Sequence, residues 1–195
     1  YRHFQSFGVK PLYPFGFGLS YTGFSISPKR ESFSVRGEIL SMEVCVRNIG
    51  NRYSGREVVQ LYAACPQTGM PKEYSRLCGF KKTGLLKPGQ EETVKISFPL
   101  KALASFDQEK CAWVLEKGLY GIFVGNSAEK TTLAGAFSVE EEAIIESTEH
   151  ICPLKDMLTE KVRPEEAALA YEAAWHEELK DKDLPVIALR PGKVC

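Results

Sequence analysis

One short segment carries residue types that could form a nucleophilic serine site. Gly18, Ser20 and Thr22 have the spacing of the GxSxG motif, in which a turn between a strand and a helix exposes a serine. Thr22 stands where that motif requires its second glycine, and no strand-to-helix pattern surrounds the segment. The overlapping Gly16-Phe17-Gly18 lacks the later glycine and the helix N-terminus of a phosphate site. The segment therefore predicts neither a hydrolase elbow nor a phosphate-binding loop.

The histidines and cysteines lack the spacing of metal ligands. His3, His150 and His176 are far apart in the sequence, which favours surface histidines. The cysteines contain no CxxC pair and predict neither a zinc site nor a disulfide scaffold; they are Cys45, Cys65, Cys78, Cys111, Cys152 and Cys195. Reduced thiols that pack as small hydrophobes favour a cytoplasmic protein, although secretion is not excluded.

The charge is distributed unevenly, although the net charge is zero. Residues 1–139 contain 18 Lys and Arg against 11 Asp and Glu, and residues 140–195 contain 7 against 14. The basic residues of the first part are scattered singly apart from the pairs Lys29-Arg30 and Lys81-Lys82, without the stripe or motif of a nucleic-acid-binding protein. No apolar run approaches the ~20 residues of a membrane span. We therefore expect neither a nucleic-acid partner nor a membrane partner.

The elements that must position these residues are short strands. From residue 24 to residue 139, apolar and polar residues alternate in runs separated by Gly, Pro and Asn. A strand pair should fold back around Pro88-Gly89, which has the residue types of a tight turn. Eight strands are expected near residues 24–29, 40–46, 57–64, 77–80, 94–100, 111–115, 120–124 and 133–139. They predict an all-β, immunoglobulin-like antiparallel sandwich with a core that includes Val44, Val46, Leu61, Val94, Ile96, Trp113, Ile122 and Phe137.

The flanks differ from this pattern. Residues 1–23 form an extended, aromatic-rich segment. Some of these aromatic side chains should be exposed, because the segment carries more aromatic surface than one strand of a small sandwich usually buries. Residues 140–195 form an acidic, partly helical tail. A helix is expected from Pro164 to Lys180, with an apolar stripe that packs on the sandwich or on another domain; the stripe is Ala168, Tyr171, Trp175 and Leu179.

Residues 12–22, which contain PFGFGLSYT, resemble the junction between the α/β domain and the fibronectin type III-like module of family 3 glycoside hydrolases of the β-glucosidase type. Further stretches agree in order and spacing: residues 48–50 with Gly55, then 57–62, 77–81 and 86–89. Ser75-Arg76-Leu77 departs from the basic-acidic-Leu step that is usual in such modules. The resemblance covers residues 1 to about 139 and implies a fibronectin type III-like sandwich.

The resemblance also implies a domain order. Residues 1–23 would be a junction segment from a preceding α/β domain, residues 24–139 the module, and residues 140–195 a connector. Such a connector favours the circularly permuted order in which the barrel domain follows. The partners would then be the catalytic barrel and α/β domains of the same polypeptide, and the parent would cleave a glycoside substrate with retention. An Asp nucleophile on the barrel and an acid/base Glu on the α/β domain would both lie outside these residues.

Local carboxylate pairs do not replace those groups. A retaining mechanism needs two carboxyl groups about 5–5.5 Å apart. Asp107 with Glu109, or Glu57 with Glu73, could be proposed, but carboxylates in turns and at strand edges are usually solvated. We therefore predict no catalytic residue, no cofactor and no metal ligand in this chain.

Two functions remain open. The first is a non-catalytic structural module that buttresses and positions catalytic domains. The second is a carbohydrate-binding or adhesion module, in which Tyr53, Tyr62, Tyr74 or Trp113 would stack on sugars. The alternation that places Trp113 in the core favours the first. The glycoside, the domain order, the oligomeric state and any substrate contact lie beyond the sequence.

Overall fold

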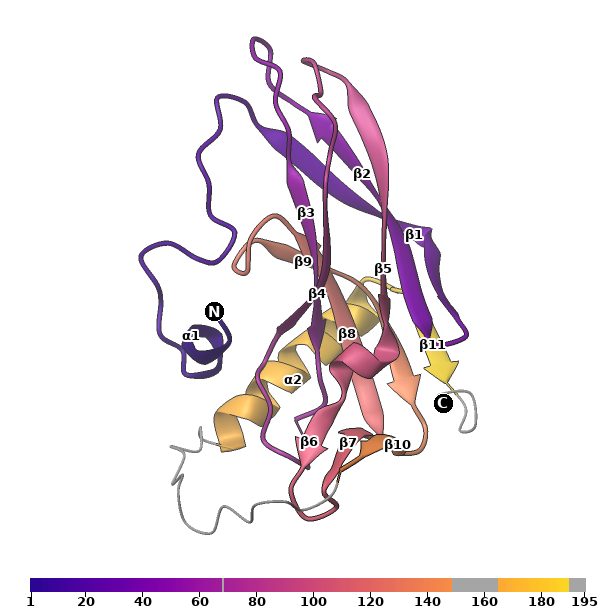
Figure 1. The fold of residues 1–195 in the computed structure, drawn as a ribbon. Coiled ribbons are helices and arrows are strands. Elements are labelled where there is room, and N and C mark those ends of the chain that lie inside the picture. Colours follow the sequence, from indigo (N-terminus) through magenta and orange to yellow (C-terminus); the bar gives the residue numbers. More distant parts are fainter. Residues whose placement is uncertain (68, 149–164, 190–195) are drawn as a thin grey trace.

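The chain forms two large β-sheets that face each other, a small third sheet at one end and one long helix (Figure 1), in a computed structural model that describes residues 1–67, 69–148 and 165–189. The first sheet has the order β1-β2-β5, with bounds Phe24–Arg36, Ile39–Asn48 and Glu91–Pro99. The second has the order β11-β9-β8-β3-β4, with bounds Val186–Leu189, Thr131–Val139, Gly118–Gly125, Val58–Ala64 and Arg76–Lys82. The third has the order β10-β7-β6, with bounds Ala143–Ser147, Ala112–Leu115 and Ser105–Asp107. The helices are α1 (Arg2–Ser6), the 3-10 helix η1 (Leu100–Leu103) and α2 (Glu165–Asp181).

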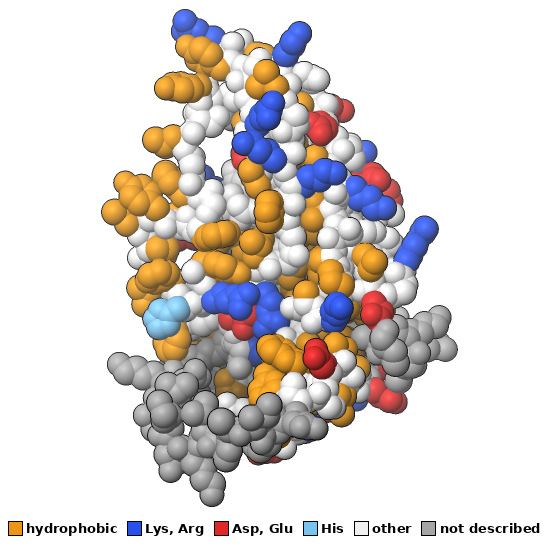
Figure 2. Space-filling model, viewed as in Figure 1, with side chains coloured by type: hydrophobic (Ala, Val, Ile, Leu, Met, Phe, Trp, Pro, Cys, Tyr) orange, Lys and Arg blue, Asp and Glu red, His pale blue; other side chains and the backbone are white. Residues whose placement is uncertain are grey.

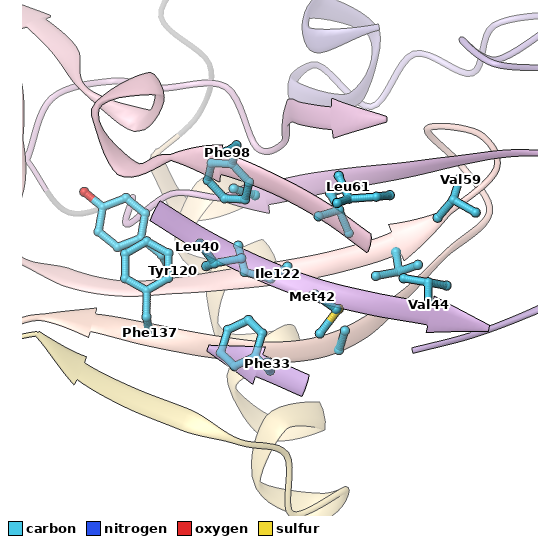
Figure 3. Close-up of a cluster of buried hydrophobic side chains, with 14 of the residues drawn as sticks. Phe33, Leu40, Met42, Val44, Val59, Leu61, Phe98, Tyr120, Ile122 and Phe137 are labelled. Atoms are coloured by element: carbon cyan, nitrogen blue, oxygen red, sulfur yellow. The ribbon is translucent and has the colours of Figure 1, made fainter. Parts of the chain in front are cut away.

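The main core lies between the two large sheets. Alternate residues of β2 are fully buried there, namely Leu40, Met42, Val44 and Val46. They meet Val59 and Leu61 of β3, and the ring of Tyr120 stacks on that of Phe137 with centroids 4.9 Å apart (Figure 3). Burying a Leu or Phe side chain stabilises a fold by about 1.5–3 kcal/mol. This shared interior therefore holds the two sheets together.

The expected all-β sandwich is confirmed. Each of the eight predicted runs forms a strand, as β1 to β5 and β7 to β9. Seven of the eight predicted core residues are buried: Val44, Val46, Leu61, Val94, Ile96, Ile122 and Phe137. Period-two alternation was sufficient here because each of these strands has one face against the core. The sequence pattern did not reveal β6, β10 and β11, which contain only three to five residues each.

The prediction that Trp113 is buried is wrong, because 42% of its surface is exposed. Cys111, the first residue of the predicted run, lies before the strand with φ at +49°. The strand therefore begins at Ala112, and Ala112 and Val114 face the interior. Trp113 points outward, against Phe106 of β6. Leu115, two residues further on, is nevertheless fully buried, so strict alternation does not hold along β7.

The turn at Pro88-Gly89 exists, but it does not join a strand pair. Gln90 N–H donates to Lys87 C=O over 2.9 Å, and Gly89 has φ at +78°. The preceding strand, β4, pairs with β3, whereas the following strand, β5, pairs with β2. The turn therefore carries the chain from one large sheet to the other.

Helix α2 packs on the outer face of the five-stranded sheet (Figure 1). Trp175 and Leu179 pack with Ala64, Leu133 and Ala136 of the sheet. The residues next to these three in the sequence face the main core on the other side of the sheet. The predicted stripe is thus confirmed, and its partner is the sandwich itself. Glu172, which is not part of this stripe, is also buried, and its carboxylate accepts a hydrogen bond from Gln67 N–H over 3.3 Å.

Strand β11 follows α2 and pairs with β9 in parallel, with Val186 opposite Ala136 and Leu189 opposite Val139. The other neighbouring strand pairs are antiparallel. The hydrogen bond from Ala136 N–H to Pro185 C=O, over 2.9 Å, begins this pairing. Residues 165–189 are therefore joined to the sandwich by both a helix face and a sheet edge.

Candidate functional site

Three of the four carboxylates that could have formed a local pair have structural roles. Glu57 accepts hydrogen bonds from Val58 N–H over 2.8 Å and from Asn126 over 3.2 Å. Asp107 accepts backbone bonds from the turn that follows it, which lowers the pKa of its carboxyl group. Glu73 binds two arginines. Ser20 lies in an exposed coil, and its hydroxyl accepts a bond from Thr22 N–H over 3.3 Å.

The histidines and cysteines are also dispersed. His3 lies beside Phe7, with ring centroids 4.5 Å apart, and His176 is half-buried on α2. Cys45, Cys65, Cys78 and Cys111 are unpaired, whereas His150, Cys152 and Cys195 lie outside the described residues. In residues 1–67, 69–148 and 165–189, no group of three metal-ligating side chains could hold an ion. Within the same residues, no helix is long and apolar enough to cross a membrane.

The structure instead points to the N-terminal segment, residues 1–23, as the candidate site. Its aromatic anchor is Tyr1, whose ring lies 5.2 Å from that of Phe15 and meets Tyr62 of β3 edge-on at 5.7 Å. The Tyr1 hydroxyl accepts a hydrogen bond from Leu77 N–H over 2.7 Å. One end of the segment is thereby attached to β3 and β4.

Further hydrogen bonds attach the segment to the β8–β9 turn. The Gln5 side chain donates to Ala128 C=O over 2.7 Å, and Ala128 N–H donates to Phe15 C=O over 2.8 Å. Gly16 has φ at +86°, and a Cβ atom there would lie 2.5 Å from the Gln60 amide nitrogen. Only glycine allows this close approach, which explains the glycine of the Pro-Phe-Gly motif.

The exit of the segment is fixed by Asn48, which is fully buried at the end of β2. Its amide oxygen accepts bonds from the Thr22 hydroxyl over 2.6 Å and from Gly50 N–H over 3.0 Å. Its amide nitrogen donates to Tyr53 C=O and Leu86 C=O over 3.0 and 2.9 Å. One saturated side chain therefore joins the segment to two loops.

A charged group completes the attachment. Glu73 binds Arg76 and lies 3.4 Å from the Arg2 guanidinium of α1. Burial raises the pKa of the Glu73 carboxyl group, but the bond to Arg76 and the charges of Arg76 and Arg2 outweigh it, so the net pKa is lowered. The ionised form is thus favoured in the folded chain.

This lowered pKa predicts a pH dependence. The stabilisation by Glu73 is complete above the unfolded pKa of about 4.3 and is lost as pH falls through the lower folded pKa. Glu73→Gln is expected to lower the free energy of unfolding by about 1.5–3 kcal/mol at pH 7 and much less near pH 3. Urea denaturation at both values measures this, with the exposed Glu91→Gln as control. A loss that is equal at both values would contradict the role of the charge.

The opposite side of the N-terminal segment is apolar and exposed. The exposed side chains are Phe4, Phe7, Val9, Leu12, Tyr13, Phe15, Phe17, Leu19 and Tyr21, with Tyr13 at 65% and Tyr21 at 92%. In Figure 2, hydrophobic side chains line the left margin, over α1 and the coil that follows it. The expected exposure of these aromatic residues is confirmed. The segment is thus bound to the sandwich on one side and open to a partner on the other.

The aromatic residues considered for sugar stacking do not form one platform. Tyr62 and Tyr74 are buried, whereas Tyr53 and Trp113 are exposed. Tyr53 lines a hollow with Tyr21 and Arg52, and Trp113 lines a separate one with Arg76. These four residues therefore do not supply the three exposed rings on one face that would have indicated a carbohydrate-binding module.

Comparisons with known proteins agree with the fold. A family model described as a fibronectin type III-like domain matches residues 57–128. A probable β-glucosidase I from Aspergillus niger is 39% identical over 148 residues, which are 72% of this chain and 18% of that protein.

Solved structures extend the match. β-Glucosidase 3B from Thermotoga neapolitana, in complex with α-D-glucose, matches with a TM-score of 0.68 and 40% identity over 74% of this chain and 20% of its own. A β-glucosidase from Paenibacillus barengoltzii matches with a TM-score of 0.71 and 35% identity over 76% of this chain and 17% of its own. The chain thus spans a fifth or less of the length of these relatives. Residues 57–128 thus form a fibronectin type III-like domain, and the chain is similar to one part of these larger family 3 β-glucosidases.

Proposed function

We propose that this chain is a non-catalytic structural module that buttresses and positions the catalytic domains of a β-glucosidase. The observation that carries the proposal is the two-sided N-terminal segment, which is attached to the sandwich by Tyr1, Gly16 and Asn48 and presents exposed aromatic side chains outward. Larger β-glucosidases that contain a similar region support it. The catalytic barrel and α/β domains of the same polypeptide would cover this surface.

The parent enzyme would hydrolyse O-glycosidic bonds with retention, using carboxylates outside this chain. The isolated chain is then expected to release no aglycone from an aryl β-glucoside. Unpaired Cys45, Cys65, Cys78 and Cys111 support a cytoplasmic location for the parent, since free thiols persist in a reducing compartment.

The test uses the full-length parent. Tyr13 and Phe17 contact each other, with ring centroids 5.0 Å apart, and both are exposed here. Tyr13→Ala/Phe17→Ala is expected to lower kcat/KM for an aryl β-glucoside about tenfold, because misplaced domains no longer hold the reacting groups in position. It should also separate the thermal unfolding of this module from that of the other domains.

The matched control is Phe80→Ala on β4, which removes another exposed aromatic ring, 68% accessible, from outside the segment. It should leave both the activity and the unfolding profile unchanged. Equal effects of the two changes, or no effect of either, would contradict the buttressing role. Release of α-glucose as the first product, detected by NMR, would contradict retention.

A further inference from the structure

A hollow of the surface around Trp113 includes Arg2 of the N-terminal segment in its lining but none of that segment's exposed apolar side chains. It has a volume of about 490 Å³ and is built from α1, β4, the region of η1, β7 and β10. Its lining includes Arg2, Arg76, Lys101, Trp113, Ile145 and Glu146. This volume lies within the range of about 300–1,000 Å³ of small-molecule sites. On the face shown in Figure 2, charged and hydrophobic side chains adjoin in the lower half of the molecule.

Trp113 provides an aromatic wall. Its outward position follows from the start of β7 at Ala112, and the ring of Phe106 meets it at 64° with centroids 5.7 Å apart. β7 is hydrogen-bonded on both sides, by β6 and β10. The ring is therefore carried on a central strand and supported from one side, while much of its surface remains accessible.

Arg76 forms a fixed polar wall. Its guanidinium donates to Ala102 C=O over 3.0 Å, to Ala104 C=O over 2.9 Å and to the Ser105 hydroxyl over 3.3 Å, and it also binds Glu73. These bonds hold η1 and the start of β6 against β4. The cavity is therefore preformed, which reduces the entropy cost of binding a ligand.

Lys101 and Glu146 provide the polar groups that are free to bind. Both are exposed, and neither forms an ion pair with another described residue. Arg2 is partly engaged by Glu73 at 3.4 Å. The hollow thus combines an aromatic surface with cationic donors and one carboxylate acceptor.

We propose that this hollow binds one pyranose ring of a neutral β-linked gluco-oligosaccharide. The C–H face of such a ring packs on an indole, and its hydroxyl groups both donate and accept, as Lys101 and Glu146 require. A simple anion could bind Lys101, but it would leave both the Trp113 ring and the Glu146 carboxylate without a partner. The site is independent of the buttressing role, because it uses none of the exposed aromatic residues of the N-terminal segment.

The test observes the two tryptophan indole N–H signals of this chain by NMR during titration with cellotriose. The Trp113 signal, assigned with Trp113→Phe, is expected to shift saturably with half-saturation at about 1–10 mM, since a single sugar subsite binds weakly. The buried Trp175 signal is the internal control and should not move. Glu146→Gln and Lys101→Ala should each weaken binding severalfold.

Trp113→Ala should abolish the remaining saturable shifts, with an unmoved Trp175 signal showing that the fold is retained. A parallel titration with glucuronate separates sugar recognition from attraction of a charge. Shifts with glucuronate alone would overturn the proposal in favour of an anion site. The absence of saturation by cellotriose, or unchanged binding in Glu146→Gln and Lys101→Ala, would also overturn it.

Discussion

Lys72→Ala is expected to lower the free energy of unfolding by about 3–5 kcal/mol, because it leaves the Glu116 carboxylate charged and unpaired in the interior. Lys72 and Glu116 form an ion pair in which both side chains are nearly inaccessible. Glu116 also accepts a bond from Met70 N–H over 3.1 Å, and the Lys72 ammonium donates to Met70 C=O over 3.0 Å. The pair thus holds the loop between β3 and β4.

Urea denaturation measures this loss, and Lys110→Ala is the control. Lys110 pairs with Glu142 and Asp107 at the surface, where solvent screens the interaction, so its loss should change stability little. Lys72→Met with Glu116→Leu should recover part of the stability, because no charge then remains buried. Similar small effects of Lys72→Ala and Lys110→Ala would show that the buried pair is unimportant.

Trp175→Ala is expected to cost about 3–5 kcal/mol, the range for removing a large buried aromatic ring. The indole is buried against Gly121 of β8, where a Cβ atom would lie 3.0 Å from the ring. Tyr171, one turn earlier, stacks on Tyr74 with centroids 4.4 Å apart. Trp175 is therefore the central contact between α2 and the sheet.

Leu169→Ala is the matched control, because Leu169 is on the same helix but exposed. Its effect on the urea midpoint, followed by circular dichroism, should be small. If both changes cost equally little, α2 does not contribute to the folding unit of the sandwich. Noncoincident transitions of helix and sheet signals in Trp175→Ala would show that the helix has detached while the sandwich remains folded.

Most of the sandwich could be predicted from the sequence, because hydrophobic alternation records which side of a strand meets the core. The failure at Trp113 has a local cause, since the positive φ of Cys111 is invisible in the pattern. The short strands β6, β10 and β11 contain too few residues to show a period. Their existence depends on partners that lie elsewhere in the chain.

The candidate site could be predicted only in part. The number of aromatic residues in the N-terminal segment indicated that some would be exposed, and they are. Its attachments join residues far apart in sequence, such as Gln5 with Ala128 and Arg2 with Glu73. The burial of Glu172 likewise involves a residue far away in the sequence, because its carboxylate accepts a hydrogen bond from Gln67 N–H. No local pattern in the sequence contains these pairings. The one local indication is the residue type of Gly16, since glycine is used where the backbone lies close to another group.

The parallel pairing of β11 with β9 also affects solubility. An unpaired sheet edge is a template for association with other chains, and the apolar second half of β9 would form such a template. β11 covers residues 136–139 and leaves an outer edge of only four residues. The opposite edge, β4, has exposed Lys81 and Lys82, which oppose edge-to-edge contact. The C-terminal strand therefore protects the module against aggregation as well as extending its sheet.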